Sequence, residues 1–249
     1  MRLKDKVAIV TGGASGFGKA IAELYAKEGA KVMVADLNGQ GAREVAEGIG
    51  ASAAYIACDV SKKADVEAMV SETVKKFGGL DIMVNNAGYT HKNQWMLNVT
   101  EEEFDRIFAV NVKAIYLSAL FCVPEMEKRG GGVIINTAST AGVRPRPGLT
   151  WYNGSKGAAI VLTKSMAVEL APKKIRVCAI NPVIGETGML ELFMGMPDTP
   201  ENRAKFLATI PLGRMSKPSD IANAALFLAD PASEFITGVA LEVDGGRCV

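Results

Sequence analysis

The sequence contains a tyrosine followed four residues later by a lysine, Tyr152 and Lys156. If this segment is helical, side chains four positions apart lie on the same face of the helix and point the same way. A phenol, whose pKa is about 10, is a weak base at neutral pH, and a neighbouring cation can lower that pKa. The pair is therefore a candidate general acid/base. The same spacing also occurs on many solvent-exposed helices, so the other motifs must decide between the two interpretations.

A glycine-rich stretch, TGGASGFG at 11–18, directly follows a short apolar run near the start of the chain. Glycines permit a tight turn there, and the helix that follows would offer free N–H groups and a positive dipole end to a pyrophosphate. The spacing is Gly-x-x-x-Gly-x-Gly, which differs from the commoner Gly-x-Gly-x-x-Gly of dinucleotide-binding proteins. The stretch predicts a nucleotide site, with a plain tight turn as the alternative.

Asp36 closes the next apolar run, near the position where an acidic residue meets the adenosine ribose in dinucleotide-binding folds. A carboxylate accepts hydrogen bonds from the ribose diol of NAD and repels the additional phosphate of NADP. Ser15 adds no positive charge for such a phosphate. The sequence therefore predicts NAD as the cofactor, unless Asp36 only caps a turn with Asn38.

Three further polar residues are candidates for hydrogen-bonding roles. Asp59 follows a third apolar run, where its side chain could accept from an adenine amino group or cap the following helix. Asn86 belongs to the sequence Asn-Asn-Ala-Gly at 85–88, which follows a fourth run. Asn111 stands inside an amphipathic helical pattern, where an amide competes with backbone hydrogen bonds and favours a kink or an ordered water.

The elements that must position these residues alternate between short β-branched apolar runs and longer amphipathic ones, which is typical of βαβ units around a parallel sheet. The expected strands are Lys6–Val10, Lys31–Ala35, Ala54–Cys58, Ile82–Val84, Val133–Asn136, Arg176–Ile180 and Ala240–Val243. We therefore expect an α/β, Rossmann-type doubly wound parallel sheet of about seven strands, with helices on both faces, in a single domain over 1–249. The stretch 185–214 is rich in Met, Gly and Pro and is expected to be a substrate loop or lid.

Composition excludes several classes of function. The chain has 28 Lys and Arg residues against 27 Asp and Glu, with no basic run, so neither nucleic acid nor an anionic membrane is indicated as a partner. The first apolar run is too short for a signal segment or a spanning helix, so we expect a soluble, cytoplasmic protein. The four cysteines form no CxxC pair and His91 is the only histidine, which argues against a disulfide framework and a metal site.

Taken together, the motifs resemble those of the short-chain dehydrogenase/reductase family. TGGASGFG, Asp59-Val60, NNAG, Asn111, Ser139 thirteen residues before Tyr152, Tyr152-x-x-x-Lys156 and the terminal Asp244-Gly245-Gly246 all occur in the family's order. Each motif alone is weak, but the resemblance covers essentially the whole chain. It implies an enzyme that transfers a hydride between NAD and a secondary alcohol or ketone.

The resemblance also implies residue roles. Tyr152 would be the acid/base, Lys156 would lower the pKa of that phenol and hold the nicotinamide ribose, Ser139 would bind the substrate oxygen, and Asn111 would connect Lys156 to solvent through a water. The implied cofactor-binding residues are Gly12, Ser15, Gly16, Phe17, Gly18, Asp36, Leu37, Asp59, Val60, Asn86, Ala87, Gly88, Tyr152, Lys156, Pro182, Gly185 and Thr187. The candidate substrate residues are Tyr89, His91, Thr140, Arg144, Trp151, Met189 and Phe193.

Two departures from the family pattern concern the substrate side. The family commonly has Asn-Pro-Gly-x-Val-x-Thr after the sixth strand, whereas this chain has Val183 in place of the glycine and Gly185 in place of the valine. The second is Trp151 beside Tyr152, with Arg144 and Arg146 nearby. Arg144 could pair with a carboxylate, sulfonate or phosphate of the substrate, or could be a surface arginine in a turn.

The substrate and the assembly are left open by the sequence. A sugar 1-dehydrogenase and a 3-oxoacyl thioester reductase are alternative enzymes, and an NAD-binding regulatory protein is an alternative of another class. The thioester reductase is disfavoured, because such enzymes usually take NADPH and would need cations where Ser15 and Asp36 stand. The helix over 157–170 is small and apolar along one side, and in the family it packs against another subunit, so we expect a homotetramer.

Overall fold

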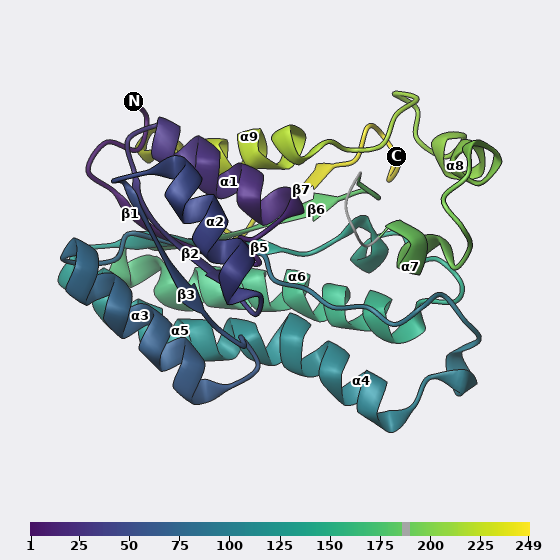
Figure 1. The fold of residues 1–249 in the computed structure, drawn as a ribbon, viewed down its shortest axis with the longest axis horizontal. Helices are drawn as coiled ribbons and strands as arrows, with labels where there is room; N and C mark the ends of the chain where they lie inside the picture. The colour runs from purple at the N-terminus through teal and green to yellow at the C-terminus, as the bar shows by residue number, and fades with distance from the viewer. Residues whose placement is uncertain (186–189) are drawn as a thin grey trace.

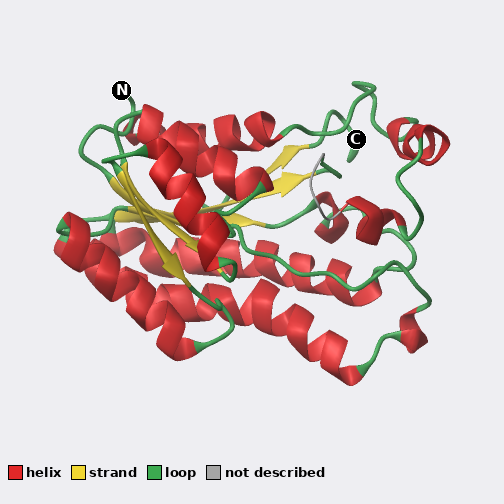
Figure 2. Ribbon diagram, viewed as in Figure 1, coloured by secondary structure: helices red, strands yellow, loops and turns green. Residues whose placement is uncertain are grey.

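The computed structural model describes residues 1–185 and 190–249, and its central feature is a seven-stranded parallel sheet (Figures 1 and 2). The strand order is β3-β2-β1-β4-β5-β6-β7, so the chain starts in the middle of the sheet, builds one half and then the other. The strands are β1 (Val7–Thr11), β2 (Lys31–Asp36), β3 (Ala53–Ala57), β4 (Ile82–Asn85), β5 (Gly132–Thr137), β6 (Ile175–Pro182) and β7 (Ala240–Val243). The predicted fold class is confirmed, and each predicted strand is present within one or two residues of its expected ends.

Helices cover both faces of the sheet, as Figure 1 shows. One layer contains α1 (Gly16–Lys27), α2 (Gly39–Ile49) and α9 (Pro218–Ala229), and the other contains α3 (Lys63–Phe77), α4 (Glu101–Phe108), α5 (Ala114–Lys128) and α6 (Thr150–Leu170). Two short helices, α7 (Leu190–Met194) and α8 (Pro200–Leu207), lie beyond the ends of β6 and β7, on the same side of the molecule as the C-terminus. They occupy the stretch that the sequence predicts to be a lid.

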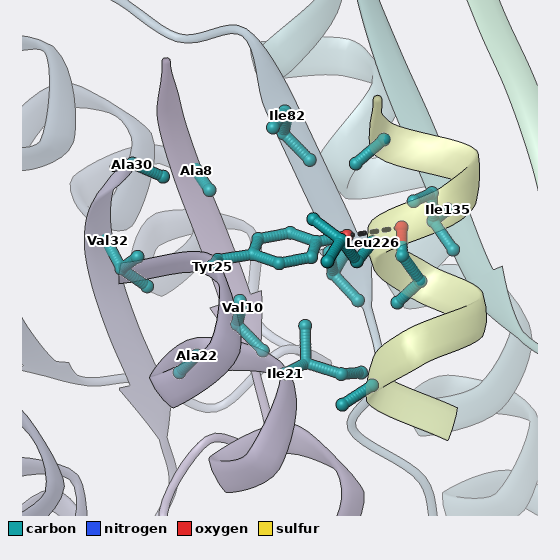
Figure 3. Packing of buried hydrophobic residues seen from close by; sticks show 14 of the residues in the cluster. Ala8, Val10, Ile21, Ala22, Tyr25, Ala30, Val32, Ile82, Ile135 and Leu226 are labelled. Carbon is teal, nitrogen blue, oxygen red and sulfur yellow. Dashed lines mark hydrogen bonds between the residues drawn. The ribbon is translucent and has the colours of Figure 1, made fainter. Parts of the chain in front are cut away.

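The core is divided by the sheet because successive strand residues point to opposite faces. Ala8 and Val10 of β1 face α1, α2 and α9, whereas Ile9 faces α3 and α5. Figure 3 shows the first of these clusters, in which the Tyr25 ring crosses from α1 toward α9 and its hydroxyl donates to the Ala225 carbonyl over 2.9 Å. Burial raises the pKa of this phenol, so it acts as a structural donor.

The stretch from Glu101 to Lys128 is long and apolar enough to cross a membrane by length and composition alone. In this fold the stretch runs from α4 into α5, in one of the two helix layers that cover the sheet. Ile107, Leu117, Cys122 and Met126 are fully or almost fully buried within the protein. The same helix carries exposed apolar residues, including Tyr116 and Leu120, on its other side.

Candidate active site

Helix α6 carries the tyrosine and lysine from which the sequence predicts acid/base chemistry. Both side chains are buried, with 6% of Tyr152 and 4% of Lys156 exposed, and the lysine Nζ lies 5.8 Å from the centroid of the phenol ring. The helical conformation expected for this pair is present. Burial on a helix that packs against β6 fixes both groups at the edge where the strands end.

The environment changes the protonation of both groups. Burial raises the pKa of Tyr152 to about 12, and a hydrogen bond with Ser139 and the positive charge of Arg146 partly offset that rise. Burial lowers the pKa of Lys156 to about 8, while its ammonium donates to the Thr137 carbonyl over 2.8 Å. The charge of Arg146 therefore lowers the pKa of Tyr152 in this structure. The effect of Lys156 on the same pKa stays a prediction.

Ser139 lies just past the end of β5 and starts a single 3₁₀ turn over Thr140–Gly142. Its hydroxyl oxygen accepts from the Ala141 N–H over 3.0 Å, which holds the side chain at the start of the turn. The same hydroxyl is within hydrogen-bonding reach of Tyr152. Ser139 and Tyr152 can therefore bind one substrate oxygen together.

Asn111 lies in a π-helical segment, Ala109–Lys113, between α4 and α5. π-helical turns inside α-helices are rare and occur mostly at functional sites. The Asn111 amide donates to the Tyr89 carbonyl and to the Ser155 hydroxyl, and its oxygen accepts from the Tyr89 N–H, at 2.9–3.0 Å. The predicted helix irregularity is present, and the side chain joins the loop after β4 to α6.

The glycine-rich turn lies between β1 and α1, and the lack of side chains is essential to its geometry. Gly12 and Gly16 have backbone φ angles of +65° and +53°, which residues other than glycine rarely adopt. A Cβ on Gly18 would lie 2.1 Å from the Gly12 carbonyl oxygen and 2.6 Å from the Asn86 amide nitrogen. The Asn86 amide in turn donates to the Thr11 carbonyl over 2.9 Å, which ties the turn to the end of β4.

Asp36 and Asp59 lie at the ends of the outer strands of the first half of the sheet. The Asp36 carboxylate accepts from the Ala14 N–H of the glycine turn over 3.0 Å and from the Asn38 N–H over 2.8 Å. Asp36 therefore makes the turn contact with Asn38 and still lines the cavity described below. Asp59 accepts from the Ser61 N–H and hydroxyl, and hydrogen bonds from Ser61 together with the charge of Lys62 hold its pKa below its usual range despite partial burial.

The segment after β6 shows why glycine stands at position 185. A Cβ on Gly185 would lie 2.5 Å from the Phe17 ring and 2.9 Å from the Ser216 hydroxyl. Val183, in contrast, is buried, and its carbonyl accepts from Ser216 over 3.2 Å. The position that needs a glycine in this chain is thus the one that faces the glycine-rich turn. The predicted residues Thr187 and Met189 lie outside the described residues.

A cavity of about 510 Å³ joins the glycine turn to the tyrosine and serine. Most of the sequence-predicted residues line it: Gly12, Ser15, Gly16, Phe17, Asp36, Leu37, Asp59, Val60, Asn86, Ala87, Gly88, Tyr89, Ser139, Thr140, Arg144, Tyr152, Lys156, Pro182, Gly185 and Phe193. Gly18 and Asn111 lie behind the wall and support it through the contacts above. The fold therefore brings the nucleotide motif and the acid/base pair into one cleft.

Two predicted substrate residues are directed elsewhere. The Trp151 indole donates to the Met96 carbonyl over 3.1 Å and packs edge-on against Phe104, at 5.4 Å between ring centroids. His91 is buried, its Nδ1 lies 2.7 Å from the Lys92 carbonyl oxygen, and neither residue is among those that line the cavity. In this structure both have a packing role next to the site.

Sequence reasoning missed several lining residues, among them Arg106, Phe206 and Arg247, and named Arg146 only as a neighbour of Tyr152 in the sequence. Arg106 lies over the Tyr89 ring, 4.2 Å from its centroid, and Arg146 lies over the Phe206 ring, 5.1 Å from its centroid. Arg247 follows the terminal Asp-Gly-Gly. No local pattern marks these residues, because they reach the cleft from separate parts of the chain.

Comparisons with known proteins agree with this geometry. The family model described as enoyl-(acyl carrier protein) reductase matches residues 12–247. A 4-formylbenzenesulfonate dehydrogenase from Comamonas testosteroni is 55% identical over 99% of both chains, and a 3-oxoacyl-[acyl-carrier-protein] reductase from Thermotoga maritima is 37% identical over the full length of both.

A solved structure has the same fold throughout. The 3-ketoacyl-(acyl-carrier-protein) reductase from Brucella melitensis, crystallised in complex with NADH, is 49% identical, with a TM-score of 0.94 over 99% of this chain and 100% of its own. All of these relatives are oxidoreductases by name. With the glycine turn, the π-helical asparagine and the Ser139, Tyr152 and Lys156 cluster in one cleft, the chain belongs to the short-chain dehydrogenase/reductase family.

Proposed function

We propose that this protein is an NAD-dependent dehydrogenase/reductase that interconverts a secondary alcohol and a ketone, with Tyr152 as the general acid/base. The observation that supports this most directly is the joint position of Tyr152 and Ser139 in a cavity that continues to the glycine-rich turn. A substrate oxygen bound by both hydroxyls would lie on the side of the cavity away from Asp36. The proposal rests on this arrangement and on the names of the relatives, all of which are dehydrogenases or reductases.

The residues of this chain would bind the substrate and move one proton. Ser139 donates a hydrogen bond to the substrate oxygen, which orients the carbonyl and stabilises negative charge on it. Tyr152 gives its hydroxyl proton to that oxygen in reduction and takes it back in oxidation. Lys156 uses one N–H group on the Thr137 carbonyl and keeps two for ribose hydroxyls. An added Cβ on Gly88 would lie 3.6 Å from both the Asn111 amide oxygen and the Lys156 nitrogen, so both groups border the same space beside Gly88, where a water would connect them.

The residues at the other end of the cavity fit NAD. Close backbone approach at Gly12 and Gly18 shapes the turn that would hold a pyrophosphate, because a Cβ at either position would clash with Asn86 and with neighbouring backbone and displace the turn. Asp36 retains acceptor capacity for a ribose diol beyond its two backbone partners. When bound, NAD would supply or accept the hydride, and its oxidised ring would add a positive charge near the phenol. The Brucella relative was crystallised with NADH, the cofactor that Asp36 favours.

Two narrower substrate classes follow from the relatives. The Comamonas enzyme, at 55% identity, is named for 4-formylbenzenesulfonate, an aromatic aldehyde with a sulfonate at the far end of its ring. The Thermotoga and Brucella enzymes are named for 3-oxoacyl groups on a carrier protein. A sugar 1-dehydrogenase and an NAD-binding regulatory protein are the other two alternatives. A panel of secondary alcohols, aromatic aldehydes, sugars and 3-oxoacyl thioesters, followed by NADH absorbance, separates the enzyme classes.

The substitution Tyr152→Phe tests the assigned reaction. It keeps the buried ring, including its edge-on contact with Phe193, and removes the hydroxyl. We expect kcat/KM to fall by about 100- to 10,000-fold, the usual contribution of a positioned acid/base, while NADH binding measured by fluorescence remains. Tyr55→Phe, at an exposed position of strand β3, is the matched control and should keep wild-type activity. Wild-type turnover in Tyr152→Phe would refute the assignment, and NADH binding without turnover of any panel member would favour the regulatory protein.

The assembly and location are part of the same proposal. Apolar side chains are exposed on α5 and α6, among them Tyr116, Leu120, Val161 and Val168. A surface of this kind fits burial against other copies of the chain, and we expect a cytoplasmic homotetramer. Light scattering on the purified protein measures this directly, and a monomer at micromolar concentration would contradict it.

A further inference from the structure

The last residues of the chain form a fixed turn at the edge of the cavity. The buried carboxylate of Asp244 accepts from the Gly246 N–H over 2.9 Å and from the Cys248 N–H over 2.8 Å. Gly245 and Gly246 have φ angles of +64° and +87°, and the Gly245 carbonyl accepts from Leu212 over 3.0 Å. These contacts hold Arg247 in one place, although it is only two residues from the end of the chain.

Arg144, in the segment after Ser139, also binds this turn. Its Nη1 donates to the main-chain carbonyl of Arg247 over 2.6 Å. The segment after Ser139 is thereby joined to the C-terminal turn, and part of the Arg144 guanidinium is used for this contact. Arg144 is exposed and also lines the cavity. Its contact with the Arg247 carbonyl gives it a positioning role, beside the anion-binding role that the sequence predicts.

Arg146 is half-buried and lies close to both Tyr152 and Arg247. Burial and the charge of Arg247 lower its pKa, and its own charge in turn lowers the pKa of Tyr152. Its guanidinium lies over the Phe206 ring at 5.1 Å. A guanidinium donates its hydrogen bonds in its own plane, so an aromatic contact over its face leaves those donors available.

The charges of these arginines are not neutralised within the part of the chain that the structure describes. No carboxylate there forms an ion pair with Arg144, Arg146 or Arg247. The Arg247 Nη1 is buried and has no hydrogen-bond partner among the described residues. A buried donor without a partner is costly, and two cations that repel one another at a cavity wall raise that cost. A bound anion would remove both penalties.

We propose that Arg146 and Arg247 form a subsite for an anionic oxygen group of the substrate, a sulfonate or carboxylate, at the end remote from the reacting carbonyl, and that Arg144 positions Arg247. This inference rests on the proposed function and specifies its substrate class. The body of the substrate would lie between Tyr152 and the arginines, where Phe193 and Phe206 line the cavity. An aromatic ring fits such walls, because aromatic side chains pack well against aromatic rings.

Binding of an inert ligand tests the subsite without turnover. Benzenesulfonate carries the anion but has no carbonyl, and methyl phenyl sulfone is a neutral molecule of similar shape. Calorimetric titration of the protein, with and without NADH, should show tighter binding of benzenesulfonate than of the sulfone. Arg247→Gln and Arg146→Gln should each weaken benzenesulfonate binding about tenfold or more relative to sulfone binding, because each removes a charge-assisted hydrogen bond. Arg247→Lys should restore part of the preference.

Three further measurements complete the experiment. Arg43→Gln on the exposed surface of α2 is the matched charge control and should leave the preference unchanged. Arg144→Ala should reduce the preference less than Arg247→Gln and should also loosen the C-terminal turn, measured by amide exchange of Arg247 and Cys248. Thermal unfolding of every variant shows whether the fold is kept.

Equal affinity of the wild type for benzenesulfonate and the sulfone would overturn the proposal. Unchanged benzenesulfonate affinity in both Arg247→Gln and Arg146→Gln would also overturn it. If these variants instead lost affinity for NADH, the arginines would be assigned to the cofactor site. Turnover of benzaldehyde and 4-formylbenzenesulfonate separates the two proposals. If benzenesulfonate binds through the arginines but no carbonyl or alcohol is turned over, the subsite stands and the proposed function fails. If both aldehydes are turned over without preference for the sulfonate, the proposed function stands and the subsite fails.

Discussion

The two ends of the cleft are built in different ways. At one end, Asp36 and Asp59 follow β2 and β3, and their carboxylates are held by backbone N–H groups only a few residues away or in the adjacent turn. At the other end, Arg144, Arg146 and Arg247 come from segments after β5 and β7 and make no ion pair within the described chain. The carboxylates at the acidic end have partners within the chain, whereas the arginines have no carboxylate partner among the described residues.

This difference separates cofactor binding, which is the same from enzyme to enzyme, from substrate binding, which varies within one fold. A dinucleotide has the same shape in every enzyme that uses it, so a short turn with fixed backbone geometry is sufficient to hold it. Substrates differ, and their binding residues are supplied by loops beyond the carboxyl ends of the strands. Under the proposed function, the carbonyl would lie between the two ends, at Tyr152 and Ser139, which both line the cavity.

Lys156 lies between the two ends and shows how strongly the cleft disfavours an unpaired cation. Its pKa of about 8 in the folded protein is below its unfolded value, so the unfolded state binds more protons between pH 8 and about 10.5. Stability therefore rises with pH through this window. Relative to Lys156→Met, the wild type should gain up to about 3 kcal/mol of unfolding free energy over this range, and the difference should be constant below pH 8. Urea unfolding of both proteins at intervals from pH 7 to 10.5 measures this, and a flat difference throughout would show that the ammonium is not desolvated.

Substitution of Gly18 and of Gly154 by alanine compares how tightly the backbone is packed at the glycine turn and beside Tyr152. Gly18→Ala places a Cβ against the Gly12 carbonyl, and overpacking of this kind costs about 1–3 kcal/mol. Gly154 lies on the exposed face of α6, two residues from Tyr152, with no atom near an added Cβ. Gly154→Ala should stabilise the protein by about 0.5–1 kcal/mol, since alanine favours helix. Thermal unfolding with and without NAD checks both, and equal stability of the two variants would refute the close-packed turn.

The charge of Asp36 is expected to set the choice between NAD and NADP. Asp36→Asn keeps the side-chain size and removes the negative charge that repels an additional phosphate. We expect the ratio of kcat/KM for NAD to that for NADP to fall about tenfold, equivalent to about 1.4 kcal/mol. Glu44→Gln on α2 makes the same change in net charge away from the ribose site and should leave the ratio unchanged. A wild type that prefers NADP would overturn the role of Asp36.

Much of the cofactor end was predictable because its residues form local patterns. The TGGASGFG turn, Asp36 and the Asn-Asn-Ala-Gly motif each follow a strand that the sequence identifies, and the carboxyl ends of parallel strands meet at one edge of the sheet. The spacing of Tyr152 and Lys156 likewise predicts a shared helix face. Boundaries were less certain, since β6 extends to Pro182, beyond the expected Ile180.

The substrate end was predictable only in part. Trp151 stands next to Tyr152 in sequence, yet a helix turns neighbouring side chains about 100° apart, and its indole packs toward Phe104 and Met96. The pKa of Tyr152 also depends on groups that the spacing does not indicate, because burial raises it and the charge of Arg146 partly counters that rise. Neither effect has a signature in residue spacing.

The sequence by itself determined the fold, the order of the strands along the chain and the candidate groups for hydride-linked acid/base chemistry, because these depend on local periodicity and on motifs with fixed geometry. Only the tertiary structure decided which arginines line the cavity, because Arg146 and Arg247 are 101 positions apart in the printed sequence and meet through the packing of the C-terminal turn against the segment after β5. The electrostatics of the cleft follow from that packing, since burial and the proximity of charges are properties of the folded chain.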